Sequence, residues 1–195
     1  MTRRVLVMFA VLAIIALGLA FYALHLKRKV ARDEQLAAQQ LALAPPANGP
    51  PTPVTLYVAS DSDGTLRRTQ VNVTLPPERT ERDRAVLRAL FGQYLQSSSP
   101  HPIGAGADVR DVYLLGDDTA IVDANAAFAD AHPSGVLAEE LTVASIVVTL
   151  NANDSKIGRV KILVNGQERE TLAGHADLRR FYEASNIGQV VKDLQ

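Results

Sequence analysis

Three carboxylates stand where they could perform chemistry. Asp123 ends an apolar, strand-like run, and Glu139 and Glu140 open a helix-like run. Glycoside hydrolases use two carboxyl groups at a defined separation, so Asp123 and one of the glutamates could act on cell-wall sugar. Each also has a simpler role, because Asp123 can cap a turn and Glu140 lies near the positive end of a helix dipole. We favour these structural roles and keep an unrecognised cell-wall hydrolase as an alternative.

The other reactive residue types form no recognisable site. His101, His132 and His175 are scattered, with no histidine or carboxylate at metal-ligand spacing. The sequence Asp61-Ser62-Asp63-Gly64 begins like a calcium loop but lacks the third acidic ligand and the distal glutamate, so we interpret it as a turn. The chain has no cysteine, G-x-S-x-G elbow or S-x-x-K pair. We therefore expect no catalytic residue, no cofactor and no metal ion.

Alternating apolar residues predict the strands that would position these groups. The predicted strands are Leu56–Val58, Val71–Val73, Val109–Leu115, Thr119–Asp123 and Arg159–Val164. Asn165-Gly166 follows the last of them and is a strong hairpin signal, because both positions of a type I′ turn have positive φ. We therefore expect three hairpins, with a further strand after Gly166.

Helical periodicity predicts two main helices. The first follows a capping box of Thr80 and Asp83 and ends before Ser97. The second runs from Gly135 to Leu150, with Ser134 as its N-cap. Its expected core-facing stripe consists of Leu137, Leu141, Ala144 and Val148. A last short helix is expected at Asp177–Ala184, and the whole predicts an α+β fold, a two-layer sandwich of a mixed or antiparallel sheet and two main helices.

The N-terminus carries an apolar run from Val5 to Leu24 between Arg3-Arg4 and Lys27-Arg28-Lys29. About 20 apolar residues span a bilayer as a helix, and the run is longer than the core of an ordinary signal peptide. Gly18 and Ala20 leave a cleaved signal peptide as an alternative. We expect an uncleaved transmembrane anchor at residues 1–29, contacting the membrane through Val5–Leu26, with the soluble domain outside the cytoplasm.

Prolines separate this anchor from the soluble domain. Residues 30–53 begin as a helix-favouring stretch and end in a proline-rich spacer, so we place the domain at 54–184 and a C-terminal tail at 185–195. Six basic residues lie near the anchor, and removing them from the net charge of −1 leaves about −7 on the rest. An acidic domain is a poor partner for nucleic acid. The lack of cysteine excludes disulfides and a lipidated cysteine.

The region from Val54 to about Tyr182 resembles the GerMN domain, the sporulation and spore germination family. The resemblance rests on VTLYVA at 54–59, TAIVDAN at 119–125, EELTVASIVVTLN at 139–151, VKILVNG at 160–166 and GHADL at 174–178. It implies a fold similar to ring-building motifs and a role in envelope or spore-envelope complexes without an established catalytic activity. The chain differs from the better-known germination protein in having one such domain, and an anchor helix in place of a lipidated cysteine.

The resemblance marks eight motif residues, which we interpret as structural: Asp123, Phe128, Glu140, Thr149, Leu150, Gly166, Gly174 and His175. We expect Gly166 to serve the turn and Gly174 to allow a bend where a side chain would clash. Thr149 would bond back to its helix, Leu150 would face the sheet, and Phe128 would fill the gap between a strand and the next helix.

These features lead to an expected function. We expect a non-enzymatic, membrane-anchored extracytoplasmic domain of the bacterial cytoplasmic membrane, acting by protein association or self-association in an envelope or sporulation-related assembly. Exposed strand edges would supply the contact. A peptidoglycan- or carbohydrate-binding module is the first alternative, although the chain has no tryptophan for a sugar platform.

The expected topology can be tested directly. Protease added to intact spheroplasts should remove the domain and leave a membrane-bound stub, because residues 30–195 would lie outside the cytoplasm. A cytoplasmic marker protein that stays intact controls for lysis. Protection of the domain from the protease would contradict the predicted orientation.

Overall fold

The computed structural model describes residues 49–187, which belong to one compact unit, Ala47–Gln195. The predicted anchor, most of the predicted linker and most of the predicted tail lie outside the described residues. The elements, in chain order, are β1 (Thr52–Ser60), β2 (Thr65–Val73), α2 (Arg79–Tyr94), β3 (Val109–Leu115), β4 (Thr119–Ala124), α3 (Ala126–Asp130), α4 (Val136–Asn153), β5 (Arg159–Val164) and β6 (Tyr182–Glu183).

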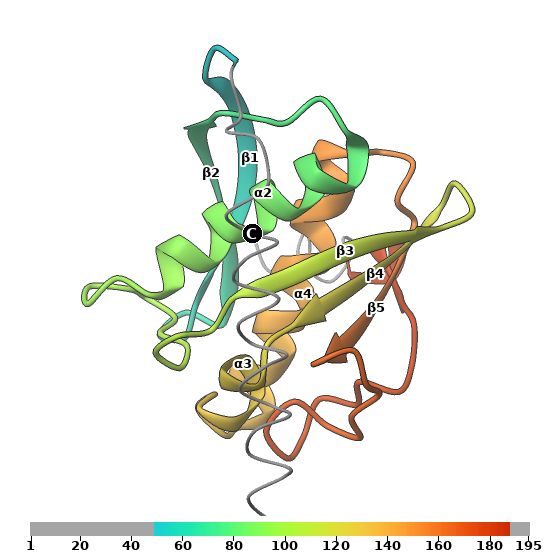
Figure 1. Cartoon of the computed structure of the whole chain (residues 1–195). Coiled ribbons are helices and arrows are strands. Elements are labelled where there is room, and N and C mark those ends of the chain that lie inside the picture. The colour runs from blue at the N-terminus through green and yellow to red at the C-terminus, as the bar shows by residue number, and fades with distance from the viewer. Residues whose placement is uncertain (1–48, 188–195) are drawn as a thin grey trace, which may run out of the picture. The chain divides into compact units, whose positions relative to one another are not determined.

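The described strands form two sheets. β1 and β2 make an antiparallel hairpin, and the second sheet has the order β3-β4-β5-β6. In that sheet β4 and β5 are parallel, with α4 in the connection between them, and the other two pairs are antiparallel. Figure 1 shows α4 behind the sheet of β3, β4 and β5. The predicted α+β class is confirmed, but the strands form two sheets where one was predicted.

Two predicted turns form because their residue types suit the backbone conformation of a turn. The turn at Asp61–Gly64 joins β1 to β2, and Gly64 has a φ of 68°. Asn165 and Gly166 have φ values of 52° and 70°, so the predicted primed turn is confirmed. Two isolated bridges, Val164 with Gln167 and Thr171 with Asp177, follow this turn, so within the described residues the expected further strand does not form directly after Gly166.

The strand that completes the second sheet lies where a helix was predicted. At Asp177–Ala184 the chain forms a turn and then β6, whose Tyr182 pairs with Val160 of β5. The hydroxyl of Tyr182 donates to the carbonyl of Asp177 at 2.8 Å, and the carboxylate of Asp177 accepts from the N–H of Arg179 at 2.9 Å. These bonds hold a tight turn that a helix could not contain, so the helix prediction was wrong.

The cap of α2 also differs from the prediction. Glu78 is the N-cap, and its carboxylate accepts from the N–H groups of Thr80 at 3.3 Å and Glu81 at 3.1 Å. Asp83 is buried in the interior instead of reaching back to the helix start. Burial, followed by the nearby Asp154, raises the pKa of Asp83 to about 6. The Thr80–Asp83 capping box was therefore wrong, because the acidic residue before Thr80 provides the cap.

Helix α4 is apolar on more than one face. It begins at Val136 with Gly135 as its N-cap, not the predicted Ser134. Its deepest residues include Val143, Ile146, Val147 and Leu150, which belong to the main core. In the predicted stripe only Leu141 is buried, and Leu137 is 53% exposed. Among the described residues, α4 alone is long and apolar enough to cross a membrane, but half of it is buried in the fold, as in a core helix.

Side chains from the helices close the free edge of β1. The N–H of Tyr57 donates to Oγ1 of Thr149 at 3.0 Å, and the N–H of Ala59 donates to the hydroxyl of Tyr94 at 3.0 Å. Asn153 bonds both backbone groups of Thr55, accepting at 3.0 Å and donating at 2.6 Å. These bonds replace a neighbouring strand, which explains why the hairpin does not join the other sheet. This edge of β1 is therefore not one of the exposed strand edges expected to supply a contact.

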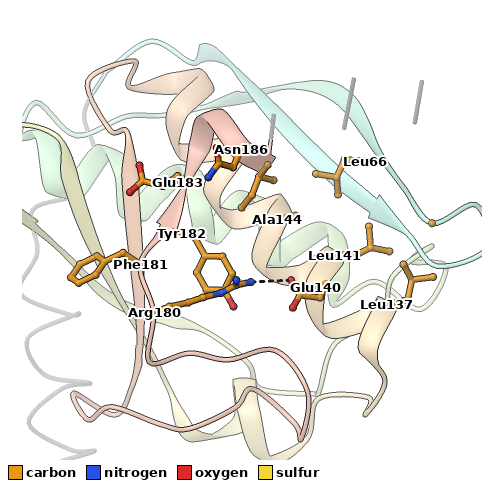
Figure 2. A pocket seen from close by; sticks show the side chains of 12 residues that line it. Leu66, Leu137, Glu140, Leu141, Ala144, Arg180, Phe181, Tyr182, Glu183 and Asn186 are labelled. Carbon is orange, nitrogen blue, oxygen red and sulfur yellow. Dashed lines mark ion pairs between the residues drawn. The ribbon is translucent and has the colours of Figure 1, made fainter. Parts of the chain in front are cut away.

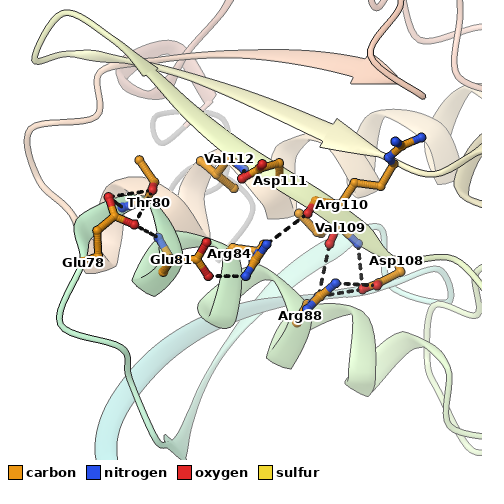
Figure 3. A network of polar contacts seen from close by, with 10 residues as sticks. All are labelled: Glu78, Thr80, Glu81, Arg84, Arg88, Asp108, Val109, Arg110, Asp111 and Val112. Atoms are coloured by element: carbon orange, nitrogen blue, oxygen red, sulfur yellow. Dashed lines mark hydrogen bonds and ion pairs between the residues drawn. The ribbon is translucent and has the colours of Figure 1, made fainter. Parts of the chain in front are cut away.

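Arginines of α2 close part of the edge of β3 in the same way (Figure 3). Arg84 donates to the carbonyl of Arg110 at 3.3 Å, and Arg88 donates to the carbonyl of Val109 at 3.1 Å. Arg88 also pairs with Asp108 at 2.7 Å. The pairing of β3 with β4 is irregular beside these contacts, between Val109 and Asp111. A β-bulge of this kind bends an edge away from regular pairing.

The closure of β1 predicts a stability change at Thr149. Thr149→Val should lower the free energy of unfolding of the isolated unit 47–195 by about 1–3 kcal/mol, because the N–H of Tyr57 loses its acceptor. Thr149→Ser keeps the oxygen and serves as the matched control. Urea denaturation measures both, and equal midpoints for the valine and serine variants would show that this bond is not needed.

Candidate functional site

The N-terminal turn of α4 holds a fully buried carboxylate, that of Glu139. Its Oε2 accepts hydrogen bonds from the N–H groups of Ala173, His175 and Ala176 at 3.0, 2.8 and 2.9 Å. Its Oε1 accepts from the N–H of Gly135 at 3.1 Å and lies 2.8 Å from Nδ1 of His175. The carboxylate thus binds the 173–176 loop to the start of α4.

These bonds decide the charge state of Glu139. Burial alone would raise its pKa, but the hydrogen bonds from the ring of His175 and from the N–H groups of the loop lower the pKa to about 2. Both oxygens are occupied by donors from the protein itself. Glu139 is therefore a charged structural group and is not available as a general acid or as a nucleophile.

Two of the predicted motif residues belong to this loop. His175 supplies a ring and a backbone donor to Glu139, and Gly174 has a φ of 122°. A Cβ at Gly174 would lie an ordinary 3.8 Å from Oγ of Ser134. The expectation of a steric clash was wrong, and the positive φ is what favours glycine there.

The two carboxylates weighed as a possible pair, Asp123 and Glu140, have different partners. Glu140 is half exposed and faces Arg180 at 3.8 Å. Asp123 is buried, and its Oδ1 accepts from the N–H of Gly166 at 2.6 Å, so it supports the Asn165-Gly166 turn. Burial raises the pKa of Asp123, and the bond from Gly166 opposes this rise. Each acid has its own partner, which is the arrangement of two structural groups and not of a glycosidase pair.

The remaining motif residues pack the interior. Leu150 is fully buried in the core. Thr149 contacts β1, as described above, where a bond back to its own helix was expected. Phe128 is fully buried on α3, a short helix that the sequence analysis missed, and its ring stacks on Phe91 at a centroid distance of 5.3 Å. Asn125 caps α3 by accepting from the N–H of Phe128 at 3.1 Å.

Two histidines that were expected to be scattered come together in the interior. Nε2 of His101 and Nε2 of His132 lie 2.6 and 2.7 Å from Oγ1 of Thr142. Asp61 lies on the far side of His101, at 2.5 Å from Nδ1. The order acid, histidine, hydroxyl resembles a nucleophile triad, but Thr142 is fully buried and no substrate could reach it. Within residues 49–187, no group of His, Asp and Glu side chains could hold a metal ion.

An apolar groove lies on the other face of α4 and has a volume of about 380 Å³. Figure 2 shows Leu137, Leu141 and Ala144 of α4 along this groove. Leu66 of β2 and Ile187 also line it. Arg180 lies over the ring of Tyr182 at 4.4 Å and pairs with Glu140, and Glu183 adds one further negative charge beside the groove.

Comparison with known families identifies the fold. The family described as "Germane: Sporulation and spore germination" matches residues 55–170, which is more than half of the chain. The chain belongs to this family. The matched region runs from β1 to just beyond β5, so the buried carboxylate of Glu139 and the groove-lining residues of α4 are parts of a GerMN-type domain.

Two solved structures are similar to this chain, and the first of them supports the fold. The tandem GerMN domains of the sporulation protein GerM from Bacillus subtilis are 22% identical, with a TM-score of 0.50, over 66% of this chain and 44% of that one. The first GerMN domain of the same protein is 20% identical, with a TM-score of 0.45, over 65% of this chain and 92% of that domain. This chain thus spans less than half of the tandem structure. No curated protein sequence matches the chain.

The Glu139 site predicts a clear contrast between adjacent glutamates. Glu139→Gln should destabilise the domain by about 1–3 kcal/mol at pH 7, because an amide cannot accept from every donor of the loop. The pKa of Glu139 is depressed from 4.5 to about 2, so its contribution to stability is complete above 4.5 and is lost as the pH falls toward 2. The variant Glu139→Gln should not show this loss of stability as the pH falls from 4.5 toward 2.

Glu140→Gln is the matched control, because its ion pair is long and half exposed. It should change the free energy of unfolding by less than about 1 kcal/mol. Thermal unfolding at a series of pH values measures both variants. Equal effects of the two substitutions would contradict the structural role of Glu139.

Proposed function

We propose that this GerMN-type protein is anchored in the membrane, lies outside the cytoplasm and acts by binding a protein partner in an envelope or sporulation-related assembly, without catalysis. The apolar run Val5–Leu24 supports the anchor, and the family assignment supports the setting. The observation that carries the binding role is the groove on α4.

Helix α4 has more apolar surface than the core uses. Ile146 and Leu150 are fully buried, yet Leu137 and the neighbouring Val136 are 53% and 63% exposed. A helix that is apolar all round is normally buried on all sides. The exposed face of α4 is therefore a surface that a partner would cover.

The groove fits the apolar face of a partner's helix. Leu137, Leu141 and Ala144 follow the spacing i, i+4 and i+7, which forms a ridge that another helix can pack against. Glu140 and Arg180 neutralise each other, and Glu183 leaves one negative charge beside the groove, so the site does not favour a strongly acidic ligand. We propose that an amphipathic helix of a partner protein occupies the groove.

A peptidoglycan strand fits this surface less well. Sugar recognition uses hydrogen-bonding groups and an open aromatic face. The floor of the groove is aliphatic, and of its two aromatic rings that of Tyr182 is covered by the guanidinium of Arg180 at 4.4 Å. The exposed ring of Phe181 is approached by Arg159 and Lys161, with cations 5.7 and 5.6 Å from its centroid. The full chain should therefore not sediment with purified murein sacculi.

The groove predicts which surface residue controls binding. A photo-crosslinking amino acid at Asn186, which lines the groove, should give one defined protein adduct when the full chain is in its native membrane. Leu137→Lys should reduce this adduct about tenfold or more, since a charge in an apolar contact costs more than 1.4 kcal/mol. Leu115→Lys is the matched control, because Leu115 is 60% exposed on β3.

Two results would overturn the proposal. An adduct that persists in Leu137→Lys would exclude the groove, and sedimentation with sacculi would favour the wall-binding alternative. The double variant Asp123→Asn, Glu140→Gln tests catalysis. Loss of the cellular phenotype in that variant, with normal fold and membrane level, would favour an enzyme.

A further inference from the structure

A continuous chain of polar groups crosses the interior between the β1–β2 turn and α4. Oδ1 of Asp61 contacts Nδ1 of His101, and Nε2 of that ring contacts Oγ1 of Thr142. The same hydroxyl contacts Nε2 of His132, whose Nδ1 lies 2.8 Å from the carbonyl of Pro133. Every contact is 2.8 Å or shorter, so each requires one proton between its two heavy atoms.

The fixed ends of this chain determine how many protons it contains. The carbonyl of Pro133 can only accept, so Nδ1 of His132 carries a proton. A carboxyl group is a stronger acid than an imidazolium, and the side chain of Asp61 is 39% exposed to water, so the proton between Asp61 and His101 belongs to the ring. Both Nδ1 atoms are therefore donors.

Thr142 has a single hydroxyl proton to distribute among three neighbours. If it donates to His132, then Nε2 of His101 must donate, and His101 carries both ring protons. If it donates to His101, then His132 carries both. If it donates to the carbonyl of Ala138, 3.1 Å away, both rings are doubly protonated. Every arrangement that satisfies the contacts places at least one positive charge on the two rings.

The surroundings decide which ring carries the charge. His101 faces Asp61, the edge of the ring of Tyr94 and the ring of His132. Burial lowers the pKa of His132 and outweighs the hydrogen bond to Pro133, which raises it. The charge of His101 lowers the pKa of His132 further, and Glu139 and Asp61 raise it by a smaller amount. His132 is thus the neutral ring and His101 the charged one.

We propose that the chain from Asp61 through His101 and Thr142 to His132 is a one-proton lock that fastens the β1–β2 turn to α4. The N–H of Asp61 also donates to the carbonyl of Pro100 at 3.0 Å, so the turn and the loop that carries His101 are held as one unit. Removal of the proton leaves one contact without a hydrogen. Addition of a second proton places two charged rings 6.2 Å apart in the interior.

The lock also bears on the groove. Gly64 ends the locked turn and lines the groove, where a Cβ on it would lie 3.7 Å from the side chain of Leu137. Acid would therefore loosen one wall of the groove and weaken partner binding. This consequence rests on the proposed function, whereas the lock itself does not.

Nuclear magnetic resonance of the histidine rings in the full chain tests the lock. At pH 7 the ¹⁵N shifts of His101 should show both ring nitrogens protonated, and those of His132 should show a bare Nε2. Asp61→Asn should leave one ring nitrogen of His101 without a proton at pH 7, because the negative partner of the ring is lost. Asp63→Asn is the matched control, because Asp63 lies in the same turn but pairs with Arg67.

The outcomes separate the lock from the groove. A bare nitrogen on His101 of the wild type at pH 7, or the same ring protonation in Asp61→Asn and Asp63→Asn, would overturn the lock. Crosslinking at Asn186 that falls on acidification in the wild type would support the link to the groove. A pH-independent adduct would exclude that link and leave the ring assignments intact. Failure of the Leu137→Lys test would count against the proposed function alone.

Discussion

The carboxylate of Glu139 is the constraint on which the C-terminal part of the domain depends. A buried charge is costly unless several donors surround it, and here the donors come from the 173–176 loop, which has little regular pairing of its own. The loop leads directly to β6 and to the residues that form one wall of the groove. The shape of the groove therefore depends on an acid that faces away from it.

Local signals in the sequence predicted the strands and turns well. The β3–β4 hairpin and Asn165-Gly166 depend on residues close together in the chain, and their turn chemistry has few alternatives. Periodicity failed in part at α4 because the helix has two apolar faces. Leu137 was assigned to the core but is exposed, whereas Leu141 belongs to the core and Ala144 packs against it, although both also line the groove. A pattern of apolar residues does not state which face the rest of the chain will cover.

The site was harder to predict than the fold. Glu139 and Glu140 are adjacent, yet a helix turns by about 100° per residue, so one points inward and the other toward solvent. The donors that distinguish them lie more than 30 residues away in sequence. The meeting of His101, His132 and Thr142 likewise joins two loops and a helix, and their spacing carries no local signature of it.

The side chains that close the edges of β1 and β3 matter when many copies of the protein lie close together. Open strand edges template cross-β polymerisation, and the risk grows with local concentration. Thr149, Asn153 and Tyr94 on one edge, and Arg84 and Arg88 on the other, occupy backbone groups that an incoming strand would need. Many copies could therefore be held close together on a surface and still form discrete complexes in place of fibrils.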